Sequence, residues 1–345
     1  MAVAALVPGT ASAAPAVPAG VTAGVAVFDR QTGTFTERLN DTKQFRAASV
    51  VKLLIALDFM WNRTSVPAAD QARLDAMLRS SDDAAASYYW SRGGSGAIVT
   101  RMVSRLGLLH TAPPPAGSAS TWGYTALSAA DTVRIYRHIL DSAPAVVRSL
   151  IMTNLRAATR CGTDGFDQYF GIPSAVARPW AVKQGWSGFG SAGSCTGFST
   201  AAIDLVQEAL HTTGTVGAGD RVIVAVLTLH PDGTAFNQAG ADLTRLVRSL
   251  RIPGAVLLPP PPAGTWFRTW GSGVRVRSAP NTSASVVGTV PAGAEVLVSC
   301  QIKGQLVVVD PYRNEWWAYL PQYGGYMTNI YIRSPANTLP GVPDC

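Results

Sequence analysis

The first half of the chain changes from a strand-like to a helix-like hydrophobic pattern. Two β-type runs come first, at 21–29 and 35–39, and the Gln31-Thr32-Gly33 turn between them predicts a hairpin. Apolar residues then recur at helical spacing. This pattern predicts a series of helices over 49–61, 68–78, 84–90, 96–106 and 128–140.

After residue 180 the pattern becomes strand-like again. Runs of β-forming residues at 180–183, 196–203 and 221–229 are followed by helical spacing over 238–250. Strands at both ends of this region, with helices between them and a helix at the end, predict an α/β fold. We expect an antiparallel sheet sandwiched by helices within residues 21–252.

A proline-rich segment divides the chain near residue 260. The prolines of 253–264 predict a stiff, extended linker. Beyond it, short β-type runs alternate with turns about every ten residues across 265–334, a pattern that predicts a small all-β barrel. Residues 335–345 remain as a C-terminal tail.

Residues 1–20 have the composition of an export signal. The apolar stretch 2–7 and the small residues Ala11-Ser12-Ala13 fit the end of a signal peptide with its cleavage site, and the alternative is a disordered arm. An even number of cysteines agrees with an oxidising compartment. We therefore expect a secreted protein that is associated with the cell wall.

The four cysteines permit three pairings. If each domain closes on itself, Cys161 pairs with Cys195 and Cys300 pairs with Cys345. The spacing of cysteine and histidine residues is not that of a zinc site, and we expect neither a metal nor a cofactor.

Charge and composition exclude two classes of protein. The chain carries 28 Lys and Arg against 21 Asp and Glu, but without a run of five like charges, so no nucleic-acid partner is expected. Although 47% of the residues are hydrophobic, no apolar run approaches the ~18 residues of a membrane span.

Lysine is rare, and its positions suggest chemistry. It occurs only at Lys43, Lys52, Lys183 and Lys303, and Lys52 follows Ser49 by three positions at the start of the long apolar helix. Residues at this spacing share one helical face, and burial would lower the pKa of the amine so that it can take the hydroxyl proton. The alternative is a helix-capping Ser49 beside an exposed Lys52.

Two further motifs lie where they could meet this pair. Ser81-Asp82-Asp83 begins another predicted helix, where simple capping is the alternative, and Lys183-Gln184 ends a predicted strand before a glycine-rich turn. Two of the four lysines therefore belong to elements that could converge on one hydroxyl.

The three motifs, in this order, resemble the serine β-lactamase and penicillin-binding protein superfamily. Its signatures are Ser-x-x-Lys, Ser-x-Asn and Lys-Thr-Gly, and the resemblance covers about 21–252 and is nearest to class A. It implies Ser49 as the nucleophile and Lys52 as its base or proton relay. Ser81 would pass the proton to the leaving group, and Lys183 would hold a substrate carboxylate or support that relay.

The resemblance also implies an oxyanion hole formed by the backbone N–H groups of Ser49 and Trp186. Substrate contacts would come from Asp83, Gln184 and Gly185. Asp83, however, replaces the usual Asn, and Gln184 replaces the usual Thr.

No glutamate lies between Ser81 and Lys183, where class A enzymes keep the residue that activates the deacylating water. We therefore expect poor β-lactam turnover and a persistent acyl-enzyme.

The pattern from Gly273 to Pro280 and the short strands after it are similar to bacterial SH3-like domains across 265–334. The resemblance implies binding to the cell wall or to a protein. The aromatic residues of this region could line a groove or fill its core: Trp266, Trp270, Trp316, Trp317, Tyr323 and Tyr326.

Two functions agree with these patterns. The preferred one is a secreted serine acyl-transfer hydrolase that acts on peptidoglycan peptide or a related amide or ester. The alternative is a catalytically impaired domain that serves as a binding scaffold, which Asp83, Gln184 and the absent glutamate favour. A lowered pKa of Lys52 would favour the enzyme.

Overall fold

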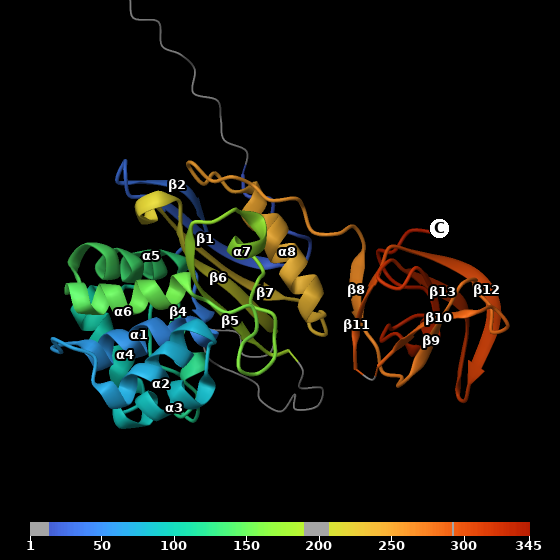
Figure 1. Ribbon diagram of the computed structural model, residues 1–345, viewed down its shortest axis with the longest axis horizontal. Coiled ribbons are helices and arrows are strands. Elements are labelled where there is room, and N and C mark those ends of the chain that lie inside the picture. Colours follow the sequence, from blue (N-terminus) through green and yellow to red (C-terminus); the bar gives the residue numbers. More distant parts are fainter. Residues whose placement is uncertain (1–13, 190–206, 292) are drawn as a thin grey trace, which may run out of the picture.

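The computed structural model describes residues 14–189, 207–291 and 293–345. Figure 1 shows a larger α/β lobe and a smaller β lobe, joined by the proline-rich segment. The predicted cleavage site at 11–13 and the predicted strand at 196–203 lie outside the described residues.

The α/β lobe is built on a five-stranded antiparallel sheet of order β2-β1-β7-β6-β5, which confirms the predicted fold class. The bounds of its strands are β1 Thr22–Asp29, β2 Thr34–Leu39, β5 Trp180–Ser187, β6 Glu208–Val216 and β7 Val222–His230. Strand β6 escaped sequence analysis because many of its buried residues are polar, among them His211, Thr212 and Thr213.

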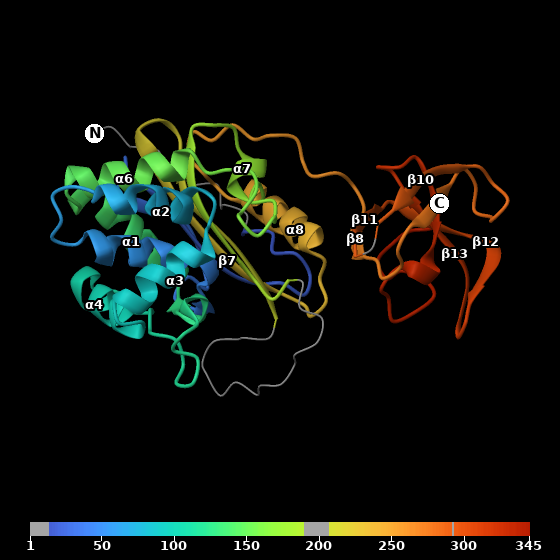
Figure 2. The ribbon, with the colours of Figure 1, turned by 60° about the horizontal axis from the view of Figure 1, so that its bottom comes forward.

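Helices cover both faces of this sheet (Figures 1 and 2). Alternate residues of β7 point to opposite sides: Ala225 and Leu227 belong to the core beneath one helical layer, and Val224 and Val226 to the core beneath the other. The larger layer holds α1 Lys52–Met60, α2 Ala68–Arg79, α3 Asp83–Arg92, α4 Gly96–Leu106, α5 Ala129–Arg137 and α6 Ala145–Arg156. The smaller layer holds α7 Ile172–Ala175 and α8 Phe236–Ser249.

Two predicted helices differ from the structure. The helix predicted over 49–61 begins with a 3₁₀ turn, η1 Ala48–Val51, so Ser49 precedes the α-helix proper. The helix predicted over 128–140 ends at Arg137 and continues as one wider turn over His138–Ser142. Two short strands, β3 Phe45–Arg46 and β4 Ala126–Leu127, pair beside η1.

The β lobe contains a five-stranded antiparallel sheet of order β10-β9-β14-β13-β12 and a separate β11-β8 pair. Among the described residues these sheets do not close into one hydrogen-bonded ring, because β10 and β12 end the larger sheet unpaired with each other. The strand bounds are β8 Thr265–Arg268, β9 Val274–Arg277, β10 Val286–Val290, β11 Glu295–Val298, β12 Cys300–Val309, β13 Tyr312–Leu320 and β14 Gly325–Thr328.

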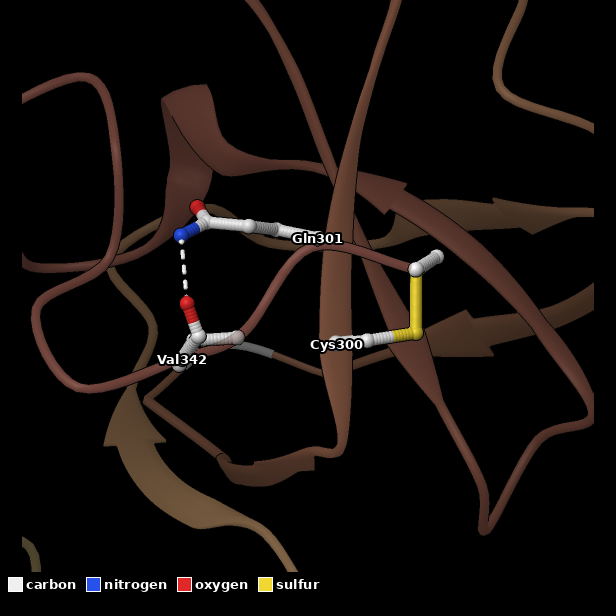
Figure 3. The surroundings of a disulfide bond; sticks show 4 residues. Cys300, Gln301 and Val342 are labelled. Atoms are coloured by element: carbon white, nitrogen blue, oxygen red, sulfur yellow. Dashed lines mark hydrogen bonds between the residues drawn. A yellow bond between two sulfur atoms is a disulfide. The ribbon is translucent and has the colours of Figure 1, made fainter.

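The C-terminal residues are an integral part of the β lobe rather than a tail. A disulfide joins Cys300 to Cys345, as one of the predicted pairings had it. Beside it the buried Gln301 amide donates to the carbonyl of Val342, as Figure 3 shows, and also to the carbonyl of Leu339. Leu339 and Val342 also lie in the core of this lobe. Cys195 lies outside the described residues, so its pairing with the exposed Cys161 stays a prediction.

The two lobes contact each other at the N-terminal end of α8. Glu295 of β11 accepts hydrogen bonds from the backbone N–H groups of Phe236 and Asn237, at 2.7 Å each. The residue before the helix, Ala235, provides no side-chain cap of its own. A carboxylate at this position satisfies unpaired N–H groups and interacts favourably with the helix dipole.

None of the helices within the described residues combines the length and the apolar character needed to cross a bilayer.

Candidate active site

Ser49 and Lys52 face each other at the junction of η1 and α1. Both side chains are buried, and the Lys52 Nζ lies 2.8 Å from the Ser49 Oγ. Ala48, just before the serine, has a φ of 45°. A non-glycine residue in this region of backbone space is strained, and such strain is concentrated at functional sites.

Ser81 and Lys183 complete a continuous network with this pair. The Lys52 Nζ lies 2.6 Å from the Ser81 carbonyl oxygen and 3.2 Å from its Oγ. On the other side, the buried Lys183 Nζ donates to the same Oγ at 2.8 Å. The three predicted motifs, distant in sequence, therefore meet around one hydroxyl.

In the Ser81-Asp82-Asp83 motif, one aspartate caps a helix and the other contacts Lys52. Asp82 caps α3 by accepting the N–H of Ala85. Asp83 points the other way, and its Oδ1 lies 2.6 Å from the Lys52 Nζ while its side chain is 64% exposed. The capping that sequence analysis considered for this motif falls to Asp82.

Burial lowers the pKa of both lysines. For Lys52 this loss of solvation is opposed mainly by the nearby Asp83 carboxylate. The pKa of Lys183 is held well below its ordinary value by burial and by the neighbouring Lys52 charge. A lowered pKa increases the fraction of neutral amine at a given pH, and only that form can accept a proton.

The contacts of Lys52 orient its lone pair. The Ser81 carbonyl and the Asp83 carboxylate can only accept hydrogen bonds. When the amine is neutral, its two hydrogens satisfy these two oxygens, and its lone pair is then available to the Ser49 hydroxyl. The geometry therefore suits proton removal from Ser49.

Strand β5 passes directly against the nucleophile, and Gly185 permits this approach. A Cβ at this position would lie 3.3 Å from the Ser49 nitrogen and 3.1 Å from the Ala47 carbonyl oxygen. Such contacts are tighter than real Cβ atoms generally make, so any other residue would push the strand away from η1. The strand brings Trp186, the second predicted oxyanion donor, into the same neighbourhood.

Gln184 lies on the opposite face of β5 from Lys183 and Gly185, as strand alternation requires. Its buried amide nitrogen donates to the carbonyls of Gln168, at 3.0 Å, and Phe170, at 2.7 Å. These bonds hold the loop that follows α6, so the structure gives Gln184 a positioning role. Its predicted contact with substrate stays a prediction.

Two residues near the nucleophile were missed as site residues by sequence analysis. The Trp122 ring centroid lies 4.5 Å from the Lys52 Nζ. Asp164 accepts a 2.8 Å hydrogen bond from the Trp186 indole. The N–H of Thr163 donates to the Ser80 carbonyl and so ties the segment that carries Asp164 beside Ser81. Only the tertiary contacts single out these two residues.

Comparisons with known proteins relate this chain to curated proteins and to solved structures. The "Putative lipoprotein LppW" of Mycobacterium tuberculosis and that of Mycobacterium bovis are each 37% identical to this chain over 245 residues, 69% of this chain and 72% of theirs. No protein-family profile matches the chain.

Among solved structures, a class A β-lactamase representative from Bacteroides cellulosilyticus matches with a TM-score of 0.50 and 12% identity, over 67% of this chain and 90% of that one. A class A β-lactamase from Mycobacterium abscessus matches with a TM-score of 0.48 and 18% identity, over 67% and 92%. The first match shows a serine β-lactamase-like fold.

Proposed function

The chain belongs to the family of the "Putative lipoprotein LppW", and from that premise we propose that it is an exported serine acyl-transfer hydrolase of the cell envelope. Its substrate would be a peptidoglycan peptide or a related amide or ester. The observation that carries the proposal is the buried network of Ser49, Lys52, Ser81 and Lys183.

In the proposed reaction, neutral Lys52 removes the hydroxyl proton of Ser49 as the Oγ attacks the substrate carbonyl. The oxyanion is held by the backbone N–H groups of Ser49 and Trp186, an arrangement worth a few kcal/mol in the transition state. The proton then passes from Lys52 through the Ser81 hydroxyl to the leaving group. Lys183, hydrogen-bonded to that hydroxyl, supports the relay.

The loop between α4 and β4 has no carboxylate that could activate a water molecule for deacylation. The sequence has no Asp or Glu from residue 84 to 130, and this loop places the Trp122 ring next to Lys52. Without a carboxylate in this loop to activate water, the acyl-enzyme is expected to persist. This supports a protein that binds penicillin covalently but hydrolyses it poorly.

Export and targeting form the second part of the proposal. The relatives are described as lipoproteins, and the small-residue pattern of 1–20 is that of an export signal. The β lobe, with its SH3-like sequence pattern, would bind the cell wall or a partner protein.

A binding scaffold without turnover is the second candidate, favoured by Asp83 in place of an amide and by the structural use of Gln184. The buried lysines argue for the enzyme, since a scaffold gains nothing from two cations that are costly to bury.

Intact-mass spectrometry with benzylpenicillin tests the proposal, on the wild type, on Ser49→Ala and on Ser95→Ala as a matched surface control. We expect a one-to-one adduct in the wild type and in Ser95→Ala that lasts for hours, and none in Ser49→Ala. A p-nitrophenyl ester serves as a second acyl donor. If neither compound acylates Ser49, the scaffold is the better description.

A further inference from the structure

We infer that the proposed active site selects acyl donors that carry a cationic group close to the reactive carbonyl, and that it discriminates against anionic ones. The inference rests on the proposed function and names its substrate class. It derives from three side chains around Ser49 that suit a cation: Asp83, Asp164 and Trp122.

Asp83 places a carboxylate next to the nucleophile. Its Oδ1 is hydrogen-bonded to the Lys52 Nζ, and most of its side chain remains open to solvent. Whenever Lys52 is neutral and ready to act as a base, this negative charge is uncompensated. A substrate carboxylate would be repelled at this point, and a substrate ammonium would be attracted.

Lys183 is poorly placed to offset that repulsion. Its amine is buried, and it donates to the Ser81 Oγ at 2.8 Å and to the Gln184 carbonyl oxygen at 3.1 Å. Lys52 and Lys183 both contact the Ser81 hydroxyl, and each charge disfavours the other. The pair does not present two positive charges to a bound anion.

Asp164 adds a second carboxylate, next to Trp186. Its exposed carboxylate is fixed by the Trp186 indole and, through Oδ1, by the Phe166 N–H at 3.2 Å. The loop that carries it is anchored to Ser80. The second carboxylate is therefore held beside the strand that supplies the predicted oxyanion donor.

Trp122 adds an aromatic surface that binds cations. Its ring already lies over the Lys52 ammonium, and its indole N–H is directed away, toward the Ser87 hydroxyl at 3.2 Å. An indole face attracts ammonium groups, including quaternary ones. The two carboxylates and the aromatic ring together favour an alkylammonium substituent over an anionic one.

The test uses three p-nitrophenyl esters of nearly equal shape: 4-(trimethylammonio)butanoate, 5,5-dimethylhexanoate and 4-sulfobutanoate. For each variant, the acylation rate of a charged ester is divided by that of the neutral ester. This ratio cancels any change in the reactivity of Ser49 that is independent of substrate charge. We expect the wild type to prefer the cationic over the anionic ester by about tenfold or more, with a preference that shrinks at high salt.

The variants are Asp83→Asn and Asp164→Asn, each expected to reduce this preference about threefold to tenfold, and the double variant is expected to remove most of it. Glu315→Gln is the control, because it changes the net charge equally but pairs with Lys303 in the β lobe. A cation-to-anion ratio near one in the wild type, or one that these aspartate variants leave unchanged, would overturn the inference.

Binding to Ser49→Ala separates this inference from the proposed function. Titration of that variant with the cationic and sulfonate anilides of the same acids, followed by tryptophan fluorescence, measures charge preference without chemistry. If no ester acylates the wild type but the cationic anilide still binds more tightly, the proposed function fails and the charge selection stands. Equal affinities, or no saturable binding of the cationic anilide, would refute the charge selection itself.

Discussion

The two lobes of this protein bury polar groups for different purposes. In the β lobe the buried polar side chains are neutral amides and hydroxyls: Gln301 holds the backbone of Leu339 and Val342, and Asn314 donates to the carbonyl of Asn337. In the α/β lobe they include Lys52 and Lys183, two amines without a buried carboxylate beside them among the residues that the structure describes.

The two kinds of buried group differ in their energetic cost. A buried amide whose hydrogen bonds are satisfied costs little and fixes the chain. A buried ammonium without a buried counter-ion is expensive, and replacing it by an apolar residue is often neutral or stabilising. The buried polar groups of the β lobe therefore stabilise it, whereas the α/β lobe retains costly buried amines whose burial the proposed reaction would explain.

Replacing Lys52 by methionine is the most direct test of whether a buried amine of the α/β lobe contributes to catalysis rather than to stability. Lys52→Met should slow acylation of Ser49 by about 10² to 10⁴, because the general base is lost. The free energy of unfolding should stay the same or rise, since a buried charge is removed. Acylation rates by stopped flow and urea denaturation measure the two effects, with the exposed Lys43→Met as the control. A strong loss of stability would show that Lys52 has a structural role.

The disulfide is the matching test in the β lobe. The double variant Cys300→Ala, Cys345→Ala should lower the free energy of unfolding of this lobe by about 2–4 kcal/mol. The reason is that its unfolded chain is no longer constrained by a cross-link across a sequence separation of 45. Acylation of Ser49 should be unaffected. Denaturation followed by circular dichroism, together with the acylation rate, checks both statements, and a parallel fall in acylation would mean that the lobes are not energetically separate.

Lowering the pH should reduce the stability of the α/β lobe more than that of the β lobe. Burial lowers the pKa of His211 and of His230 to about 4, whereas in the unfolded chain both titrate near ~6.5. Their neutral forms stabilise the α/β lobe fully above that range, and this stability is lost as the pH falls from 6.5 toward 4, by about 1–2 kcal/mol each at pH 5. All four histidines precede the proline-rich segment, so the β lobe should not respond in this way. Unfolding curves at pH 7.5 and 5.0 test this, and His211→Gln should reduce the difference.

The smallest expected effect concerns the contact between the lobes. Glu295→Ala removes the carboxylate that caps α8 and should cost about 0.5–2 kcal/mol. Calorimetry should then show the two lobes unfolding more independently. Glu315→Ala, which removes another Glu of the same lobe, is the control. An unchanged unfolding profile would mean that Glu295 contributes nothing to coupling.

Local patterns account for a large part of what could be predicted. The hairpin, most of the helices, the proline-rich segment and the order of the three motifs are written in short stretches of sequence, because periodicity and spacing are local properties. Strand β6 and helix α6 were missed, the first because its polar side chains are buried rather than exposed.

The sequence by itself thus determined which residues form the network on which the proposed function rests: Ser49, Lys52, Ser81 and Lys183. Only the tertiary structure decided what surrounds them. Asp83 turned toward Lys52 while Asp82 became the cap, Gln184 turned away to hold a loop, and Trp122 and Asp164 came in from loops with no motif of their own. The reason is physical: the direction of a side chain and the burial of a charge depend on neighbours that are distant in sequence, and burial is what lowers the pKa of these lysines.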